Sequence, residues 1–512
     1  MEILLSWSAF SILAITLIAI IFVKCIAAIY WEQTYWKKKG VPYLKSVPPL
    51  GSMYLHTFRR LNIVDHSQLL YNLHPDARYV GFMNLMTPSV LIRDPELIRD
   101  IAVKHFDHFT DRLQFIREEV DPIFAKNVAI LGGERWKEMR NILTPSFTSA
   151  KMKFMFGLVS KCARTFVDYL IDNPEYTKMV DAKDAFSRYA TDVISSVAFG
   201  VSVDSMKDPE NEFFMRGNTI MTKIFGHLYK LLLTYVFPRF SKIIGVRLID
   251  SETVNFFHTL VSETVKARIE QGIVRPDMLH LLMQAKNKED LTTPMTVDDI
   301  VSQAFIFFLA GFDAPSNLMA HMVYALAMHP EIQEKLHNEV DRYYEESNGE
   351  ITYEALMKME YMDMVISEAN RKYNNSVYVD RVCTKTYELP PPAPGCASVT
   401  LDPGANVWFP IYSMLHDPRF FPDPEKFDTE RFSDKNKDKI VPYSYIPFGV
   451  GPRQCIGNRF VLMEIKILMF YFLRKFVVKR NEKTVSNIVY AKGTFALVPE
   501  EKLLFTWEKR DV

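Results

Sequence analysis

The chain has few of the residues that build disulfide frameworks or zinc sites. Its five cysteines stand far apart along 512 residues, without a CxxC pair, and no HExxH motif occurs. An odd number of scattered cysteines argues against a disulfide framework and favours a reducing compartment. A cysteine that takes part in chemistry must therefore act alone, and the candidates are Cys25, Cys162, Cys383, Cys396 and Cys455.

An excess of charge of one sign is also missing. The 61 basic residues balance 61 acidic residues, so composition gives no indication of a nucleic-acid partner. No GxGxxG pattern occurs, and the chain therefore shows no dinucleotide site of its own. It has apolar bulk instead: almost half of the residues are hydrophobic and 37 are phenylalanine, which is enough for a large core and a large apolar cavity.

The longest uncharged run lies at the N-terminus, at Ile3–Val23. A run of this length can span a bilayer, and it lacks the basic start and the cleavage site of a signal peptide. Lys24 and Lys37–Lys39 follow it, which by the positive-inside rule leaves the rest of the chain in the cytosol. We therefore expect one uncleaved anchor at residues 1–24, a stiff, non-helical hinge rich in basic residues and proline at 25–53, and one continuous domain at 54–512.

Helical periodicity dominates that domain. Apolar residues recur at three- and four-residue spacing, and Thr296 can cap the longest helix, with Asp298 and Asp299 in its first turn. We expect a mainly α protein with small β-sheets, an α+β fold. The expected helices are Lys151–Asp172, Asp184–Phe199, Glu252–Gln271, Thr296–Ala327 and His329–Ser347; the expected strands are Arg78–Asn84, Ser89–Arg93, Asn406–Pro410 and Lys502–Trp507.

One segment allows two interpretations. Lys223–Phe240 is strongly apolar with a few basic residues between. We slightly favour core packing. The alternative is a segment that dips into the membrane and admits apolar ligands from the lipid.

Cys455 lies in the stretch PFGVGPRQCIGNRF, just before an apolar helical run at Phe460–Val478. Glycines let backbone amides approach a bound atom closely. Amide donors at a helix N-terminus and a nearby cation, here Arg453, stabilise a thiolate. A buried, inert thiol is the usual role of a lone cysteine, but this pattern favours a permanently ionised metal ligand.

The motif FxxGxRxCxG, formed by Phe448, Gly451, Arg453, Cys455 and Gly457, resembles the haem loop of the cytochrome P-450 superfamily of haem-thiolate monooxygenases. SEANR carries the family's ExxR pair, and FDTERF matches its PERF segment with Thr429 in place of proline. The resemblance implies a cytochrome P-450 fold in which haem b lies between a long central helix and the cysteine loop, with Cys455 as the axial iron ligand.

The resemblance also implies roles for charged residues. Glu368, Arg371 and Arg431 would form a buried network that supports the haem loop. Trp136 and Arg140, in WKEMR, share one helix face and would reach a haem propionate. Two buried propionates require several donors, and the further matching positions are Arg112, Arg381 and Arg453.

The central helix departs from the family pattern [AG]Gx[DE]T. Ala310, Gly311 and Asp313 fit it, but Ala314 stands where a threonine hydroxyl would bend the helix and help to deliver protons. Pro315 follows, and its missing N–H leaves the Gly311 carbonyl without its helical donor. The proline either keeps a groove that holds water without the alcohol, or marks neutral drift, and both interpretations stay open. Asp313 remains a candidate relay through water.

Two neighbouring features carry further expectations. Ser316 or Asn317 can replace the lost alcohol only if the helix is reshaped, because both point elsewhere around it. Asn374 stands where the family usually has proline, which predicts a less rigid loop beside the haem.

GVPYLK, FPDPEKFDTERF and the cysteine loop resemble the insect detoxification branch of the microsomal type, families 6 and 9. This implies an endoplasmic reticulum monooxygenase that inserts one oxygen atom from O2 into a lipophilic molecule: a xenobiotic, insecticide, plant toxin, pheromone or lipid. Electrons from NADPH would come through NADPH–cytochrome P-450 reductase, with cytochrome b5 a candidate second donor. A docking face at Arg135, Lys137 and Lys466 is one hypothesis.

The substrate pocket is expected along several segments, with ordinary core packing as the alternative at each position. The expected lining comprises parts of Phe109–Ala129, then Phe308, Ala310, Ala314, Val377, Val379, Thr494 and Phe495.

Two rival functions remain open. One is a haem-thiolate isomerase or dehydratase that needs no oxygen activation, which Ala314 favours. The other is a non-catalytic haem protein that sequesters ligands.

Overall fold

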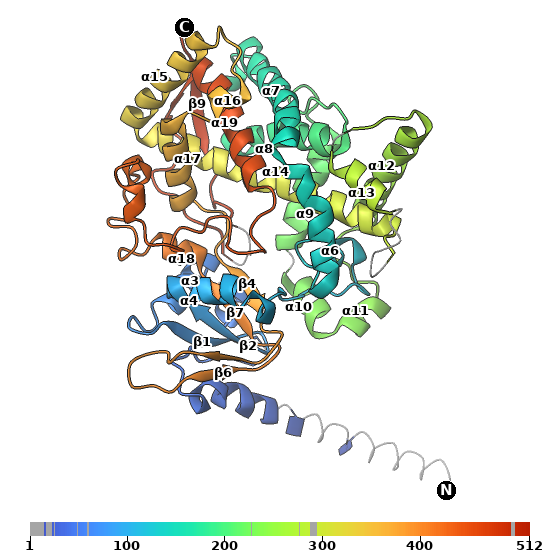
Figure 1. The fold of residues 1–512 in the computed structure, drawn as a ribbon, viewed down its shortest axis with the longest axis vertical. Helices are drawn as coiled ribbons and strands as arrows, with labels where there is room; N and C mark the ends of the chain where they lie inside the picture. Colours follow the sequence, from blue (N-terminus) through green and yellow to red (C-terminus); the bar gives the residue numbers. More distant parts are fainter. Residues whose placement is uncertain are drawn as a thin grey trace.

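The computed structural model describes residues 15–16, 23–24, 26–48, 50–58, 61–226, 228–275, 277–286, 294–492 and 497–512. Most of the predicted anchor, residues 1–24, therefore lies outside the described residues. Within these ranges, no helix combines the length and the apolar character that crossing a bilayer requires. Figure 1 shows helices filling the upper part of the molecule, a small sheet below them, and helical residues 26–38 beneath the sheet.

The fold is mainly α with small sheets, as predicted. The five predicted helices are present at α7, α8, α12, α14 and α15, and a π-helical turn at Ser195–Phe199 extends α8. The helices are α2 Tyr54–Thr57, α3 Ile63–Tyr71, α4 Pro95–Arg99, α5 Pro122–Ala125, α6 Gly133–Leu143, α7 Ser149–Asp172, α8 Ala182–Ile194, α9 Glu212–Gly226, α10 Leu228–Val236, α11 Pro238–Ile243, α12 Ser251–Glu270, α13 Met278–Lys286, α14 Val297–Met328, α15 Pro330–Glu346, α16 Tyr353–Leu356, α17 Glu360–Lys372, α18 Ile411–Leu415 and α19 Asn458–Lys475.

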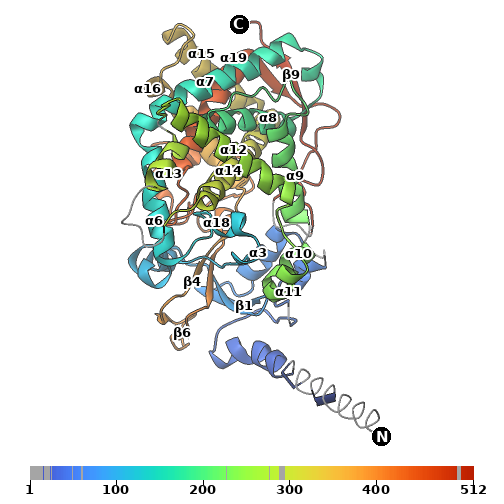
Figure 2. The same ribbon diagram turned by 90° about the vertical axis from the view of Figure 1, so that its right-hand side faces the viewer.

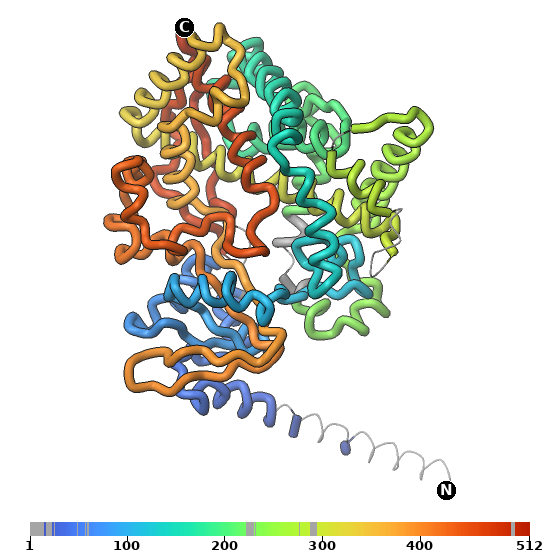
Figure 3. The backbone as a smooth tube through the Cα atoms, in the orientation of Figure 1, coloured from blue at the N-terminus to red at the C-terminus, as the bar shows by residue number. Residues whose placement is uncertain are grey.

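The main sheet joins segments from both halves of the chain, as the adjacent blue and orange tubes in Figure 3 show. Its order is β1 (Tyr79–Asn84), β2 (Thr87–Ile92), β7 (Asn406–Phe409) and β4 (Val379–Val382). Strand β2 runs antiparallel to β1 and parallel to β7, and β4 runs antiparallel to β7. The sheet therefore carries the segment after α17, which ends in β4, back to the centre of the molecule.

Two smaller sheets complete the β structure. One has the order β3 (Val180–Asp181), β9 (Leu504–Lys509) and β8 (Phe476–Lys479), and the other pairs β5 (Tyr387–Leu389) with β6 (Val399–Leu401). Strand β8 corrects one prediction. The expected helical run Phe460–Val478 ends as a helix at Lys475, and the β-branched residues that follow pair with β9.

Helix α14 is the central element. Figure 2 places it in the middle of the helical layer, with α8, α12 and α13 around it. Thr296 and Asp299 form the capping box that the sequence predicted, each side chain bonding to the other's backbone N–H. Gly311 lets α8 approach closely, because a Cβ there would lie 2.7 Å from Cδ1 of Ile194.

The hinge predicted at 25–53 is not the non-helical spacer that was expected from its prolines. Its backbone is helical at 26–38, and Trp36 is buried and donates from Nε1 to the Phe82 carbonyl at 2.8 Å. Beyond the helix, the Leu44 N–H donates to the Gly81 carbonyl and the Gly81 N–H to the Pro42 carbonyl. The segment therefore continues the edge of β1, because that edge offers unpaired backbone groups.

The segment Lys223–Phe240 and the residues after it are not simply core. It spans the end of α9, α10 and the start of α11. Phe237, Phe240 and Ile243 are 58%, 53% and 82% exposed. These exposed apolar side chains show that core packing does not hold for α11.

Candidate active site: a cysteine loop below the central helix

A cavity of about 440 Å³ lies between α14 and the loop that precedes α19. Cys455 faces it from the loop, and Ala310, Gly311 and Ala314 face it from α14. The structure thus places two motifs on the walls of one cavity: the cysteine motif, and the α14 motif that departs from the family pattern. They lie more than 100 residues apart in the sequence. Other lining residues include Arg112, Val128, Ala129, Trp136, Arg140, Phe147, Ile194, Asn370, Val379, Phe448, Arg453 and Gly457.

The loop around Cys455 is held by tight turns. The Cys455 N–H donates to the Phe448 carbonyl at 2.9 Å. Gly451 has a φ of +75°, and a Cβ there would lie 2.1 Å from the Ala102 carbonyl oxygen. Only glycine fits both the left-handed backbone and this approach. The glycine therefore fixes the path of the loop that presents Cys455.

Burial raises the pKa of the Cys455 thiol in the protein alone, while the Gly457 N–H and the cations Arg140 and Arg112 oppose the shift. This corrects the expectation for Arg453. Its guanidinium carbon stacks 3.9 Å from the centre of the Trp136 ring and its nitrogens bond to the Thr110 and Leu131 carbonyls. Support for the thiolate thus comes from two other arginines.

Three arginines, Arg112, Arg140 and Arg453, line the cavity, and Arg381 lies close enough to Arg112 and Arg453 for their charges to interact. Arg112 donates to the Arg453 carbonyl at 3.4 Å and Arg140 to the Gln454 carbonyl at 2.8 Å. Arg381 is fully buried and donates to the Val450 carbonyl at 3.1 Å. Burial, and then the charge of neighbouring arginines, hold the pKa of Arg381 and Arg453 below its usual value. The site therefore holds an excess of positive charge.

These arginines fit a dianionic ligand. Three of their buried nitrogens, Nε of Arg112, Nε of Arg381 and Nη1 of Arg453, have no acceptor among the described residues. Buried donors without partners are costly, and carboxylates accept from guanidinium groups strongly. A haem carries two such carboxylates, so the donor set and the cysteine together fit this group.

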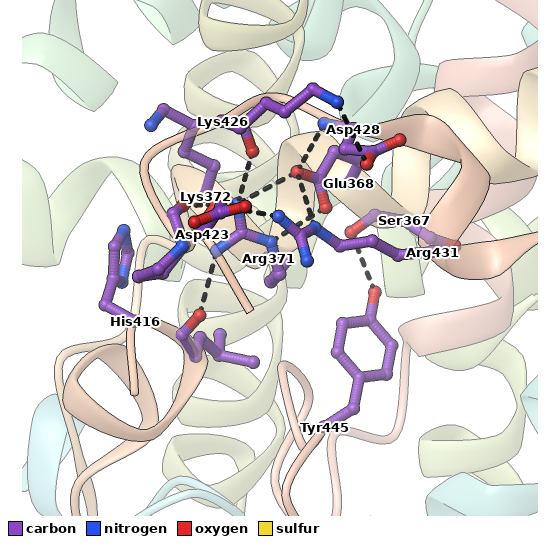
Figure 4. A network of polar contacts seen from close by, with 12 residues as sticks. Ser367, Glu368, Arg371, Lys372, His416, Asp423, Lys426, Asp428, Arg431 and Tyr445 are labelled. Atoms are coloured by element: carbon purple, nitrogen blue, oxygen red, sulfur yellow. Dashed lines mark hydrogen bonds and ion pairs between the residues drawn. The ribbon is translucent and has the colours of Figure 1, made fainter. Parts of the chain in front are cut away.

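Glu368 and Arg371 form a bidentate pair at 2.7 and 2.8 Å, and neither side chain is exposed. Arg431 lies 3.6 Å from Glu368, and Arg371 also donates to the Leu415 and Pro424 carbonyls. Figure 4 shows the three charged side chains pointing toward one another. Tyr445, three residues before the cysteine motif begins at Phe448, donates to the Ser367 carbonyl at 3.0 Å. The pair thus joins α17 to the loops that lead into the cysteine loop.

The sequence predicted a less rigid loop at Asn374, where the family usually has proline, but the Asn374 side chain makes several hydrogen bonds there. Its side chain is buried and donates to Asn370 at 2.8 Å and to the Pro447 carbonyl at 3.3 Å. Its Oδ1 accepts from the Ser376 N–H at 2.7 Å. Hydrogen bonds to Asn370, to Ser376 and to Pro447, the first residue of the cysteine loop, therefore hold this segment in place of a proline ring.

Helix α14 remains continuous through Pro315, and the residues that it contributes to the cavity wall include no alcohol. Ser316 is buried and donates to the Phe312 carbonyl at 2.7 Å, so its hydroxyl bonds back along the helix. Asp313 does not line the cavity; its Oδ1 accepts from Lys183 of α8 at 2.9 Å. The reshaping that Ser316 would need has not occurred.

Several predicted positions lie elsewhere. Phe308 packs within an aromatic cluster against Phe257 and Phe312, and Val377 packs in the core beside the main sheet, so neither lines the cavity. Thr494 and Phe495 lie outside the described residues. Lys466 has no exposed side chain and pairs with Asp363 at 2.7 Å, which removes it from any docking face.

The sequence analysis did not identify a cluster of polar side chains on the cavity wall. Asn370, Asn374, Asn375 and Ser376 all line the cavity. The signal was the amide-rich run NRKYNNS that follows the ExxR glutamate, of whose amide residues only Asn374 was considered.

A cysteine presented by a glycine loop below a long helix, beside arginines whose buried nitrogens lack acceptors among the described residues, defines a haem-thiolate protein. The chain belongs to the cytochrome P450 family, whose model matches residues 69–506. It is thus a cytochrome P450 monooxygenase that uses haem iron and O2.

Similar proteins place it beside an insect branch. The chain is 42% identical to cytochrome P450 9e2 of Blattella germanica, over 96% of this chain and 97% of the relative. It is 35% identical to cytochrome P450 9b2 of Drosophila melanogaster, over 92% and 94%. Probable cytochrome P450 6a13 of the same fly is 34% identical over 92% and 94%. The predicted likeness to families 6 and 9 is confirmed.

Proposed function

We propose that this chain is a membrane-anchored monooxygenase that oxidises lipophilic, uncharged small molecules with electrons from NADPH, delivered by a reductase. The composition of the cavity walls carries the proposal. Helix α14, which is described throughout, contributes Ile306, Phe307, Ala310, Gly311, Ala314 and Leu318 and no charged side chain. The charged residues that line the cavity are Arg112, Arg140 and Arg453. The space beside α14 therefore suits an apolar substrate.

Haem b is the group that the site fits, and when bound it supplies the activation and transfer of oxygen. Cys455 would bind the iron through sulfur. Arg112, Arg140 and Arg453, which line the cavity, would hold the acid groups together with Arg381, whose Nε has no acceptor among the described residues. Trp136 stacks against Arg453. The apolar α14 wall would orient the substrate and exclude water from it.

We further propose that residues 1–24 anchor the protein in the endoplasmic reticulum membrane, with the domain in the cytosol. Exposed apolar side chains support a lipid contact at two places: Ile26, Ile29 and Tyr30 on the N-terminal helix, and Phe240 and Ile243 on α11. Figures 1 and 2 place both at the same end of the molecule. Exposed basic residues, Arg239 and Lys242, flank the apolar side chains on α11, as in interfacial helices.

The first test is reconstitution in membranes with NADPH–cytochrome P-450 reductase. We expect NADPH- and reductase-dependent oxidation of lipophilic substrates, and a thiolate-type spectrum of the reduced carbon monoxide complex that Cys455→His abolishes. Cytochrome b5 should raise the rate only if it acts as the second donor. If haem is bound and is reduced by the reductase, but no substrate of a broad panel is oxidised, the result would instead support a non-catalytic protein that sequesters ligands.

Ala314 is the one observation that favours a second function. An isomerase or dehydratase acting on a hydroperoxide or an oxime needs no proton delivery to dioxygen. Conversion of such substrates without NADPH would identify it.

A further inference from the structure

The cavity wall beside Ala314 has a polar neighbour that comes from outside α14. Asn375, in the segment between α17 and β4, lines the cavity together with Gly311 and Ala314. Its side chain bonds to α14 on both sides of Ala314: Nδ2 donates to Oδ2 of Asp313 at 3.4 Å, and Oδ1 accepts from Nδ2 of Asn317 at 3.5 Å. The amide is therefore held at the position where the helix offers no hydroxyl.

Asp313 continues this contact away from the cavity. Its Oδ1 accepts from the Lys183 ammonium at 2.9 Å, and the Lys183 side chain is 33% exposed. Asn375, Asp313 and Lys183 thus form an unbroken series of polar side chains from the cavity to the solvent side of α8.

Ser316, another polar residue near Ala314, already has hydrogen-bond partners within the protein. Ser316 accepts from Lys183 at 2.7 Å and donates back to the Phe312 carbonyl, so its hydroxyl faces away from the cavity. The Gly311 carbonyl lacks its helical donor because residue 315 is proline. A water molecule between the Asn375 amide and this carbonyl would have polar partners on both sides, which a buried water requires.

We propose that Asn375 is a positioning residue that holds water between the cavity and Asp313, and so admits solvent protons to the site. The proposal rests on the proposed monooxygenase function, in which two electrons and two protons are consumed for each O2, with one oxygen atom entering the substrate and the other leaving as water. The Lys183 ammonium, which solvent reaches, passes a proton to the Asp313 carboxylate; the carboxylate passes a proton to the held water, and the water passes one into the cavity. Solvent returns a proton to Lys183, so the chain is unchanged after each turnover.

The test compares Asn375→Leu with the parent protein in reductase-containing membranes. We expect hydrogen peroxide released per NADPH consumed to rise several-fold, because two-electron-reduced oxygen that is not protonated in time for O–O cleavage leaves instead, with two protons, as hydrogen peroxide. Adding Ala314→Thr should restore a low ratio in Asn375→Leu. Asn173→Leu, on the exposed residue after α7, is the matched control and should leave the ratio unchanged.

A second measurement does not depend on turnover. The carboxylate infrared band of Asp313 in the resting protein, assigned by Asp313→Asn, should shift in Asn375→Leu because a hydrogen bond is lost. An unchanged band and an unchanged ratio would overturn the proposal. A raised ratio that Ala314→Thr fails to restore would also overturn it, since the leucine would then act by distorting the cavity.

The two proposals fail in different ways. A parent protein without reductase-dependent O2 uptake contradicts the monooxygenase function, whereas the infrared band still decides the Asn375–Asp313 contact. If Asn375→Leu does not retain haem, Asp313→Asn and Lys183→Met decide the relay, because both change residues outside the cavity lining. An unchanged peroxide ratio in both would overturn it.

Discussion

At the scale of single residues, Glu368 and Arg371 exchange two hydrogen bonds in a fully buried place. Arg371 also holds three backbone carbonyls, those of Leu415, Pro424 and Lys426, so one guanidinium organises the chain on both sides of the pair. Taking one partner away leaves the other charge without a counter-ion in the core.

Glu368→Gln should therefore lower the free energy of unfolding by about 3–5 kcal/mol, because Arg371 loses its counter-charge. Denaturant unfolding monitored by haem absorbance measures this. Arg431→Gln is the matched control, since its contact with Glu368 is longer at 3.6 Å, and it should cost clearly less. Equal losses in the two variants would show that Arg431 carries as much of the network as Arg371.

The two glycines before Cys455 give a second comparison. Both have positive φ, +74° at Gly449 and +75° at Gly451, but only Gly451 approaches another segment, at the Ala102 carbonyl. Gly449→Ala should cost about 1–2 kcal/mol from backbone strain alone. Gly451→Ala should cost more and release haem, as measured by the thiolate-type spectrum after gel filtration. Equal haem retention in both variants would contradict a close fit at Ala102.

At the scale of elements, α14 has a well-capped N-terminus and a centre that lacks one backbone hydrogen bond. The capping box at Thr296 and Asp299 fixes where it begins, and Pro315 removes one backbone donor from its middle without breaking it. The helix survives because almost all of it from Asp299 to Ala327 is buried against neighbours, and packing outweighs the lost hydrogen bond.

Pro315→Ala restores the donor to the Gly311 carbonyl. We expect the free energy of unfolding to rise by about 1–3 kcal/mol. We also expect more hydrogen peroxide per NADPH, because the carbonyl no longer holds water. Pro330→Ala is the control: this proline is the first residue of α15, where its missing N–H is not needed, and neither quantity should change. If Pro315→Ala is more stable but releases the same amount of hydrogen peroxide per NADPH, the Gly311 carbonyl takes no part in proton delivery.

At the scale of the whole molecule, buried acids link elements and make stability depend on pH. Asp192 of α8 accepts from the backbone and the hydroxyl of Ser205, at 3.0 and 2.6 Å, and burial raises its pKa to about 7. A carboxyl whose pKa is higher in the folded than in the unfolded state stabilises the fold while it is protonated. This contribution is complete below pH 4 and is lost as the pH rises through about 7.

Asp192→Asn removes that titration and keeps the oxygen that accepts from Ser205. The variant and the parent should have similar stability near pH 5, and the variant should be more stable at pH 8, by about 2 kcal/mol. Thermal unfolding at a series of pH values measures the difference. A difference that does not grow between pH 5 and pH 8 would show that Asp192 is ionised throughout.

Prediction from sequence worked where the signal is local. Long amphipathic helices such as α7, α12 and α15 were located to within two residues, since their periodicity is written in consecutive residues. The helical run after Cys455 was extended too far, because the β-branched residues of β8 form a strand only through pairing with β9. The buried Lys466 and the core position of Phe308 also depend on partners from other elements.

The sequence by itself determined the family, the helices, the cysteine that faces the cavity and the absence of an alcohol at Ala314. These follow from residue identity and from spacing along one segment. Only the tertiary structure decided which arginines support Cys455, how Asn374 holds its loop, and that Asn375 bonds to α14 on both sides of Ala314. Such contacts join segments dozens to hundreds of residues apart, and their geometry arises from packing, for which a single sequence holds no local signal.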